Sequence, residues 1–132
     1  MKTNYSRPSI NRKAQRDAPY HKKKVVFNVH LSRELRAKNE GIRSLPVRTD
    51  DVVLILRGKY AGLQKRVTQV SFKKGKIQVE GVKTTKTDGT EIFHYIYPSN
   101  CLLMSFGKMD DSRKAIIDRK ISAKKENKSG ET

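Results

Sequence analysis

Residues 49–82 constrain the fold more than any other part of the chain. They contain two apolar runs on either side of a glycine-containing turn, and a third apolar run follows residues 73–76. Residues 52–56 are all Val, Ile or Leu, which favours a pleated and buried strand. Gly58 and Gly62 bracket the turn, where glycine permits a positive φ and lets another backbone come close. The pattern therefore predicts short strands joined by tight turns.

The same turn carries three side chains that suit nucleic acid, namely Arg57, Lys59 and Tyr60. Cations on an exposed loop suit a phosphate backbone, and an aromatic ring suits a base or ribose face. The turn lacks the G-K-[ST] ending of a nucleotide P-loop. We therefore expect it to contact RNA rather than a free nucleotide.

Residues 49–107 are expected to form five short strands, at 52–56, 67–72, 77–80, 92–96 and 102–106. Residues 73–76 are typical of a tight hairpin turn, and Asp88-Gly89 closes a longer one. Val67 and Val70 break strict alternation, which indicates a bulge in the second strand. Five short strands at this spacing predict a mainly β fold, a small barrel.

Residues 49–82 resemble the KOW motif, which occurs in ribosomal proteins and in transcription elongation factors. The matching features are the acidic pair before the first apolar run, the two turn glycines and the valines of the second run: Asp50, Asp51, Gly58, Gly62, Val67 and Val70. The chain departs from the motif at Lys65 and Arg66, near which the family usually has a small residue. The resemblance implies an SH3-like barrel that often binds RNA.

A wider resemblance runs from about residue 11 to about residue 125. This resemblance rests on two segments before the motif and three beyond it. They are residues 31–36, 42–47, 88–90 and 97–99, and the basic tail over 113–125. Over this length the chain is similar to the eukaryotic and archaeal L twenty-six family of large-subunit ribosomal proteins, the counterpart of bacterial L twenty-four. The resemblance implies a structural protein that catalyses no reaction. It also implies binding to the 5′ region of large-subunit RNA, early assembly, and neighbouring ribosomal proteins near the peptide exit tunnel.

Charge narrows the range of partners. The 132 residues include 30 Lys and Arg against 13 Asp and Glu, a formal net charge of +17. Such a charge repels itself in a compact state unless a polyanion neutralises it, so nucleic acid is the first candidate and an anionic membrane surface the second. Hydrophobic residues make up 35%, so only part of the chain is expected to bury a core.

Residues 1–48 are expected to form a basic N-terminal arm with a short helix. They hold 13 Lys and Arg against 3 Asp and Glu but few apolar side chains, so we expect them to add little to the stability of the barrel. Pro8 and Pro19 disfavour a long helix, which predicts an extended start. Ser32 is a suitable N-cap for a helix over residues 33–39, with Gly41 after its end.

Residues 108–132 are expected to form a basic C-terminal helix and tail. Asp110, Asp111 and Ser112 form a suitable N-cap cluster. Ile117 and Ile121 lie four positions apart, which predicts a helix over residues 112–125 with one apolar face.

Catalytic and metal sites find no support in the sequence. Asp50 and Asp51 are neighbours whose side chains would point to opposite faces of a strand, so we expect a solvated start of the strand rather than a carboxylate pair. His21, His30, His94 and Cys101 match no common zinc spacing, so no metal and no cofactor are expected. Cys101 is the only cysteine, which excludes an internal disulfide.

The basic residues at the N-terminus of the arm could also belong to a targeting segment. No run approaches the roughly 18 apolar residues of a membrane span, and no apolar segment follows the first charges as a secretory signal requires. A transit peptide remains the less favoured alternative, because prolines and the lysine run of residues 22–24 interrupt an amphipathic helix.

The residues expected to bind RNA lie in the arm, in the short helix and in the KOW segment. They are Arg12, Lys13, Arg16, Tyr20, His21, Lys22, Lys23, Lys24, Arg33, Arg36, Arg43, Arg48, Arg57, Lys59, Tyr60, Lys65 and Arg66. The hairpin-tip lysines Lys73, Lys74 and Lys76 remain undecided between RNA contact and solvent. A merely solubilising tail would not need such one-sided charge, since acidic residues serve that purpose better.

The resemblance thus implies a cytoplasmic ribosomal protein, assembled in the nucleolus if eukaryotic, with ribosomal RNA and neighbouring ribosomal proteins as partners. No membrane and no small-molecule substrate are expected. The first alternative is a KOW-type transcription elongation factor that binds nascent RNA and polymerase. The second is a peripheral membrane or polyphosphate binder.

Overall fold

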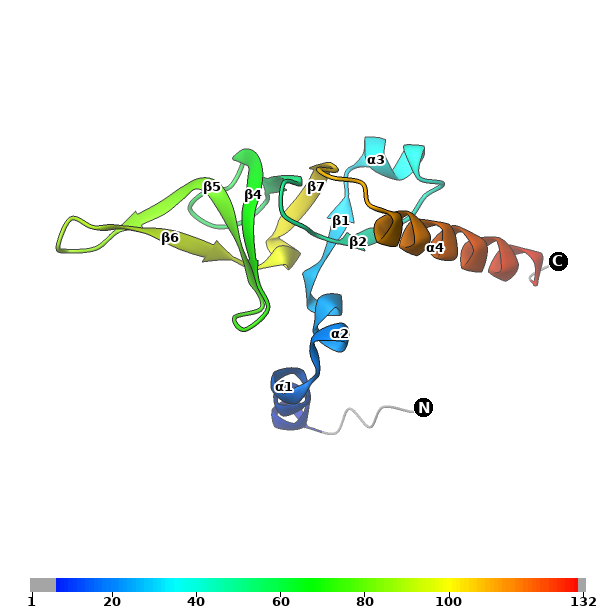
Figure 1. The fold of residues 1–132 in the computed structure, drawn as a ribbon, viewed down its shortest axis with the longest axis horizontal. Helices are drawn as coiled ribbons and strands as arrows, with labels where there is room; N and C mark the ends of the chain where they lie inside the picture. The colour runs from blue at the N-terminus through cyan, green and yellow to red at the C-terminus, as the bar shows by residue number, and fades with distance from the viewer. Residues whose placement is uncertain (1–6, 131–132) are drawn as a thin grey trace.

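The computed structural model describes residues 7–130, and within them it contains seven strands and several helices (Figure 1). In chain order the elements are α1 (Pro8–Asp17), α2 (Tyr20–Lys23), η1 (Lys24–Phe27), β1 (Asn28–Leu31), α3 (Arg33–Lys38), β2 (Ser44–Pro46), β3 (Val52–Ile55), β4 (Gln64–Ser71), β5 (Lys76–Thr85), β6 (Glu91–Ile96), η2 (Pro98–Asn100), β7 (Cys101–Ser105) and α4 (Asp111–Ser129).

The strands form one mixed sheet in the order β2-β1-β7-β3-β4-β5-β6. Neighbouring strands are antiparallel except β1 and β7, which pair in parallel through His30–Leu102 and Leu31–Leu103. The five strands predicted from the sequence correspond to β3 to β7, so the mainly β class and the C-terminal helix are confirmed. The strand count differs, because the two short strands β1 and β2 extend the sheet beyond the expected five.

The predictions for the glycine turn, the bulge in β4 and the N-cap of α3 are confirmed. Gly58 and Gly62 have φ of 100° and 86°, the left-handed region that glycine enters without steric cost. The pairing of β4 with β5 shifts register between Val67 and Gln69, which is the expected bulge. Ser32 caps α3 by accepting a hydrogen bond from the Leu35 amide at 3.3 Å.

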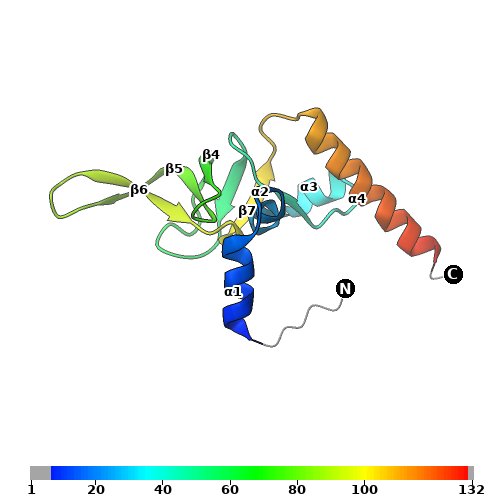
Figure 2. The same cartoon turned by 60° about the horizontal axis from the view of Figure 1, so that its bottom comes forward.

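The predicted extended start of the arm is wrong over α1. Pro8 lies in the first turn of this ten-residue helix, where its missing N–H would have had no intrahelical acceptor. Proline therefore begins the helix instead of preventing it. None of the ten residues of α1 is buried, so the helix stands clear of the core and points away from the sheet (Figure 1 and Figure 2).

The expectation that residues 1–48 add little to the core is also wrong. Seven of their side chains are buried in the same hydrophobic cluster as the strands of residues 49–107: Phe27, Val29, Leu31, Leu35, Ile42, Leu45 and Val47. β1 alternates buried and exposed positions as a half-buried strand should. The exposed part of the arm thus ends at Val26, and the chain enters the core at Phe27.

Helix α4 is confirmed and is longer than predicted. Ile117 is buried in the core cluster, and Ile116 and Ile121 pack against it from the same helix. Asp110 occupies the N-cap position, but its carboxylate makes no cap hydrogen bond and bonds Arg48 instead. The helix and the β5–β6 hairpin project toward opposite ends of the molecule (Figure 1).

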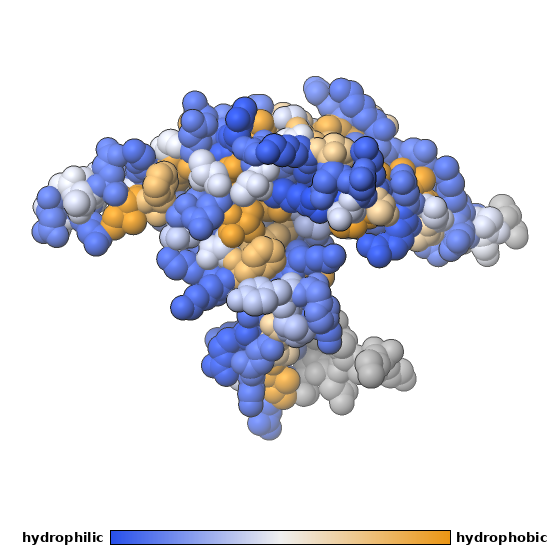
Figure 3. All heavy atoms as spheres, viewed as in Figure 1, coloured by the Kyte–Doolittle hydropathy of each residue, from blue (hydrophilic) through white to orange (hydrophobic). Residues whose placement is uncertain are grey.

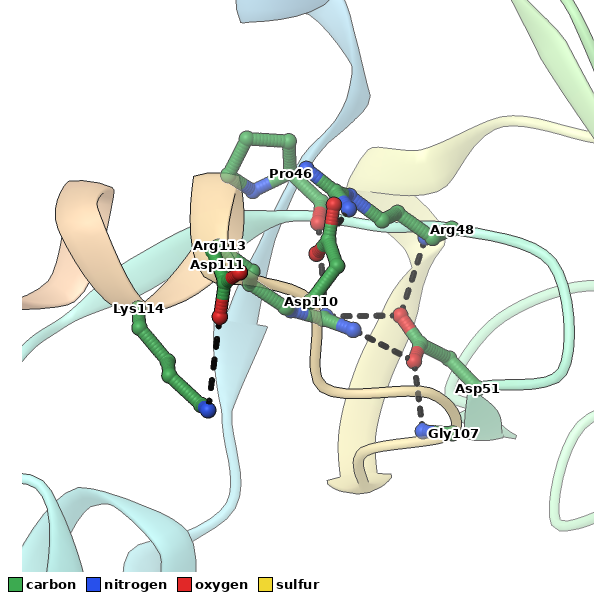
Figure 4. A network of polar contacts seen from close by, with 8 residues as sticks. All are labelled: Pro46, Arg48, Asp51, Gly107, Asp110, Asp111, Arg113 and Lys114. Carbon is green, nitrogen blue, oxygen red and sulfur yellow. Dashed lines mark hydrogen bonds and ion pairs between the residues drawn. The ribbon is translucent and has the colours of Figure 1, made fainter.

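A buried ion pair joins α4 to the sheet (Figure 4). Arg113 donates to both carboxylate oxygens of Asp51, each at 2.7 Å, and both side chains are almost fully buried. The same carboxylate accepts the amides of Gly107 at 2.8 Å and Arg48 at 2.9 Å. The prediction of a solvated Asp51 is therefore wrong, because four N–H groups replace its water.

Candidate nucleic-acid interface

The arm and the turn between β4 and β5 enclose a groove. Its volume is about 560 Å³, and its walls come from α1, α2 and η1 on one side and from residues 72–75 on the other. The turn is close to the arm, since a Cβ added at Gly75 would lie 3.7 Å from Val26 Cγ1. Figure 3 shows hydrophobic residues at this junction, bordered by hydrophilic ones.

Cations line the groove from both sides. Arg12, Arg16 and Lys23 come from the arm, and Lys73 and Lys74 come from the turn. Among the described residues that line it there is no Asp or Glu. The hairpin lysines that sequence reasoning left undecided therefore share one site with the arm.

An aromatic ladder leads from the core to the groove. Phe27 is buried and packs against Phe72 with ring centroids 4.8 Å apart, and Phe72 meets Tyr20 edge-on at 5.9 Å. Tyr20 remains 71% exposed, and Lys23 Nζ lies 5.7 Å from the centroid of its ring. Sequence reasoning found Tyr20 but missed Phe72, whose role depends on a contact between distant segments.

A second cavity, of about 280 Å³, lies beside the turn of residues 57–62 in the KOW-like segment, which we call the KOW turn. Arg57, Lys59 and Tyr60 line it from the turn, and the other lining residues include Lys76 of β5, His94 of β6 and Tyr97, which follows β6. Arg57 and Lys59 are exposed, as expected of phosphate-binding side chains. Its described lining residues also include no carboxylate.

Tyr60 is more than an exposed ring. It is half-buried against the core, its hydroxyl donates to the carbonyl of Lys83, and its ring lies 5.7 Å from that of His94. Tyr60 therefore holds the KOW turn against β5 and β6. Removing its ring would disturb the fold as well as any contact with RNA.

Tyr97 connects the two cavities. It follows β6, is 54% exposed, and lines both the groove and the KOW-turn cavity. Lys76 Nζ lies 4.6 Å from its ring centroid, and Lys74 Nζ lies 3.9 Å from that of Tyr95. The arm, the hairpin turn and the KOW turn thus border one basic surface with aromatic rings between the cations.

The other predicted RNA-binding residues of α1, α2, η1 and β4 line neither of the two cavities. Lys13, His21, Lys22 and Lys24 are exposed or partly exposed on α1, α2 and η1. Lys65 and Arg66 are exposed at the start of β4 and line neither of the two cavities. The structure therefore groups the arm with the KOW turn but leaves these two strand residues apart.

The cations of α3 and of the following loop form a second basic area. Arg33 and Arg36 are exposed on α3, and Arg43 lines a hollow with Lys120 and Lys124 of α4. Lys120 donates to the carbonyl of Ser44 at 2.6 Å, and burial lowers its pKa from the usual lysine value. This second basic area is separate from the groove.

Arg48 has a structural partner. It bonds the carboxylate of Asp110, and this hydrogen bond lowers the pKa of Asp110 below its usual value. The Arg48 side chain is therefore held at the start of α4. It has less freedom to reach a phosphate than the cations of the groove.

Metal-binding clusters and membrane-spanning helices are absent from the described part of the chain. Within residues 7–130, no three His, Cys, Asp or Glu side chains converge as a metal site would require. Of the helices in the same range, none is long and apolar enough to cross a membrane.

Comparisons with known proteins cover the arm, the sheet and the first half of α4. The profile of a family described as ribosomal proteins L26 of eukaryotes and L24 of archaea matches residues 5–120. "Large ribosomal subunit protein uL24" of Korarchaeum cryptofilum (strain OPF8) is 36% identical over 120 residues, which cover 91% of this chain and 91% of that protein. The residues matched by the family profile therefore include those that line the groove and those of the KOW turn.

Proposed function

The chain belongs to the family of ribosomal proteins that comprises L26 of eukaryotes and L24 of archaea, and from this premise we propose that it binds ribosomal RNA as a structural constituent of the large subunit. In this role it catalyses no reaction. It neutralises phosphates and holds an RNA fold in place, which needs a charged and shaped surface rather than reactive groups.

One observation carries this proposal. Two cavities that share Tyr97 are lined by cations and aromatic rings, and by no carboxylate among the described residues. A surface that only kept the protein soluble would mix both signs of charge. Cations beside aromatic rings suit a polyanion whose bases have π faces, which describes RNA better than a lipid surface.

The arm supplies most of the groove's charge and is the part we assign to phosphate contacts. Its proposed contacts are Arg12, Lys13, Arg16, His21, Lys22, Lys23 and Lys24, with Tyr20 against a base. The KOW turn adds Arg57, Lys59 and Tyr60, and further proposed contacts are Arg33, Arg36, Arg43, Arg48, Lys65 and Arg66. We further propose that residues 1–48, 49–107 and 108–132 act as three functional parts of the chain.

Position and timing follow from the family resemblance. We propose early binding to the 5′ region of large-subunit RNA, next to other ribosomal proteins near the peptide exit tunnel. The proposed location is the ribosome in the cytoplasm, with assembly in the nucleolus in a eukaryotic cell.

Sedimentation of cell extracts through sucrose gradients at low and high salt tests this function. The protein should travel with the large subunit at both salt concentrations. A protein that stays near the top of the gradient at low salt contradicts the proposal and favours the elongation-factor or lipid-binding alternative. Arg12→Gln/Arg16→Gln should leave the subunit at lower salt than the wild type, whereas Lys114→Gln on α4 serves as the matched control.

A further inference from the structure

We propose that the groove between the arm and the β4–β5 turn binds an unpaired RNA base, with its flanking phosphates on the groove's cations. The inference rests on the proposed RNA-binding function and makes it specific. It assigns to one site the recognition of a bulged or looped-out nucleotide, which a uniform phosphate-binding surface would not provide.

The shape of the groove suits a base. Its volume of about 560 Å³ lies within the range of about 300–1,000 Å³ typical of small-molecule sites. Its lining includes Val26, Phe27 and Phe72, which we call the apolar floor, together with the cations of both walls. Phosphates alone gain nothing from an apolar floor, whereas a base removed from the helical stack does.

The rings of the groove are placed for stacking. Tyr20 is 71% exposed and meets Phe72 edge-on with ring centroids 5.9 Å apart, and Phe72 in turn packs against buried Phe27. Tyr97 presents a second ring, 54% exposed, among the lining residues. An exposed ring held in place by packing offers its face to a ligand without a large loss of conformational entropy on binding.

The charges select an anionic ligand. Arg12, Arg16 and Lys23 on one wall and Lys73 and Lys74 on the other supply cations on both sides of the apolar floor. Of these cations, Arg16 also forms an exposed ion pair with Asp17, in which Nε lies 3.1 Å from Oδ1. Water screens this pair, so it holds Arg16 only weakly. An RNA strand that places one base on the apolar floor would bring the two phosphates that flank this nucleotide to the cations of the two walls.

The test uses the full-length protein and two RNA hairpins whose stems are closed by the same non-nucleotide linker, so that they have no loop bases and differ only in one unpaired nucleotide in the stem. Affinity for each is measured by fluorescence anisotropy. The wild type should prefer the bulged hairpin by about tenfold, the size of one base–aromatic stacking contact. Tyr20→Leu should bring the ratio of the two affinities close to one, because the stacking contact is available only to the bulged hairpin.

Phe93→Leu is the matched control, because Phe93 is an exposed ring on β6 that does not line the groove. It should keep the full preference for the bulge. Thermal melting of both variants establishes that each is folded. A photo-cross-link from 4-thiouridine at the bulge should map to residues of the groove, which locates the base independently of affinity.

The outcomes separate this inference from the proposed function. Equal binding to both hairpins by the wild type, or a preference that survives Tyr20→Leu, overturns the base site and leaves RNA binding intact. A cross-link that maps only outside the groove does the same. No binding to either hairpin overturns RNA binding and the base site together.

Discussion

Arg113 in the first turn of α4 holds Asp51, the residue before β3, in a buried bidentate ion pair with both N–O distances at 2.7 Å. The guanidinium also lies 4.6 Å from the centroid of Phe106 and donates to the carbonyl of Pro46 at 3.5 Å. The pair therefore ties the C-terminal helix to the segment before β3 and to the end of β7.

Removing one partner of this pair should be strongly destabilising. Arg113→Ala leaves the Asp51 carboxylate buried with only the Gly107 and Arg48 amides, and we expect a loss of about 3–5 kcal/mol in the free energy of unfolding. Urea denaturation measures it. Asp51→Asn/Arg113→Met should cost less than the sum of its single changes, because neither buried charge is then left alone.

Lys114→Ala is the control for this prediction. Lys114 is the next residue on α4, and its ion pair with Asp111, at 3.6 Å, is exposed on both sides. Its removal should change stability by less than about 0.5 kcal/mol. Equal effects of Arg113→Ala and Lys114→Ala would contradict the role assigned to the buried pair.

Two truncations of the arm should behave differently. Deleting residues 1–18 removes α1, which buries no side chain, so the melting temperature should stay close to that of the whole chain. Deleting residues 1–30 also removes buried Phe27 and Val29 and most of β1, so the protein should lose its cooperative transition. Thermal denaturation of both truncated chains decides this.

The shorter truncation should also weaken RNA binding. It removes five cations, Lys2, Arg7, Arg12, Lys13 and Arg16. If most of them neutralise phosphates, the slope of log affinity against log salt should become shallower by about 3 to 4 on duplex RNA. An unchanged slope would mean that α1 is only a solvated extension.

Lys59 and Tyr60 should affect RNA binding and stability separately. Lys59→Ala should lower the salt slope by about one and leave the melting temperature unchanged, because this lysine is exposed. Tyr60→Phe should keep the slope but cost about 1 kcal/mol of stability, because the hydroxyl loses the Lys83 carbonyl. Salt titrations and urea denaturation on both variants measure the two effects, and a Tyr60→Phe variant as stable as the wild type would refute the hydrogen bond's contribution.

Cys101 should make stability fall in alkaline solution. Burial raises the pKa of its thiol from 9.0 to about 11, so above pH 9 the unfolded chain releases the proton before the folded one does. The stability associated with Cys101 is complete below pH 9 and declines by about 2 kcal/mol by pH 11. Urea denaturation of the wild type and Cys101→Ala at pH 8 and pH 11 isolates this effect, and a constant difference between them would contradict it.

Local sequence patterns determined much of this protein. The apolar runs predicted β3 to β7, the turn glycines predicted positive φ, and broken alternation predicted the bulge at Val67. These features depend on neighbours along the chain, so they can be read from residue type and spacing. Pro8 also had a local signal, since proline at the first position of a helix is favourable, but the interpretation as a breaker was wrong.

Tertiary structure alone decided the features that join distant segments. Asp51 and Arg113 lie 62 positions apart, and an aspartate looks solvated until an arginine and two amides surround it. Phe72 and Tyr97 became part of one surface with the arm only because β4 and β6 end beside it. Burial and convergence depend on which chain segments pack together, and that packing follows from the free energy of the whole core rather than from any local pattern.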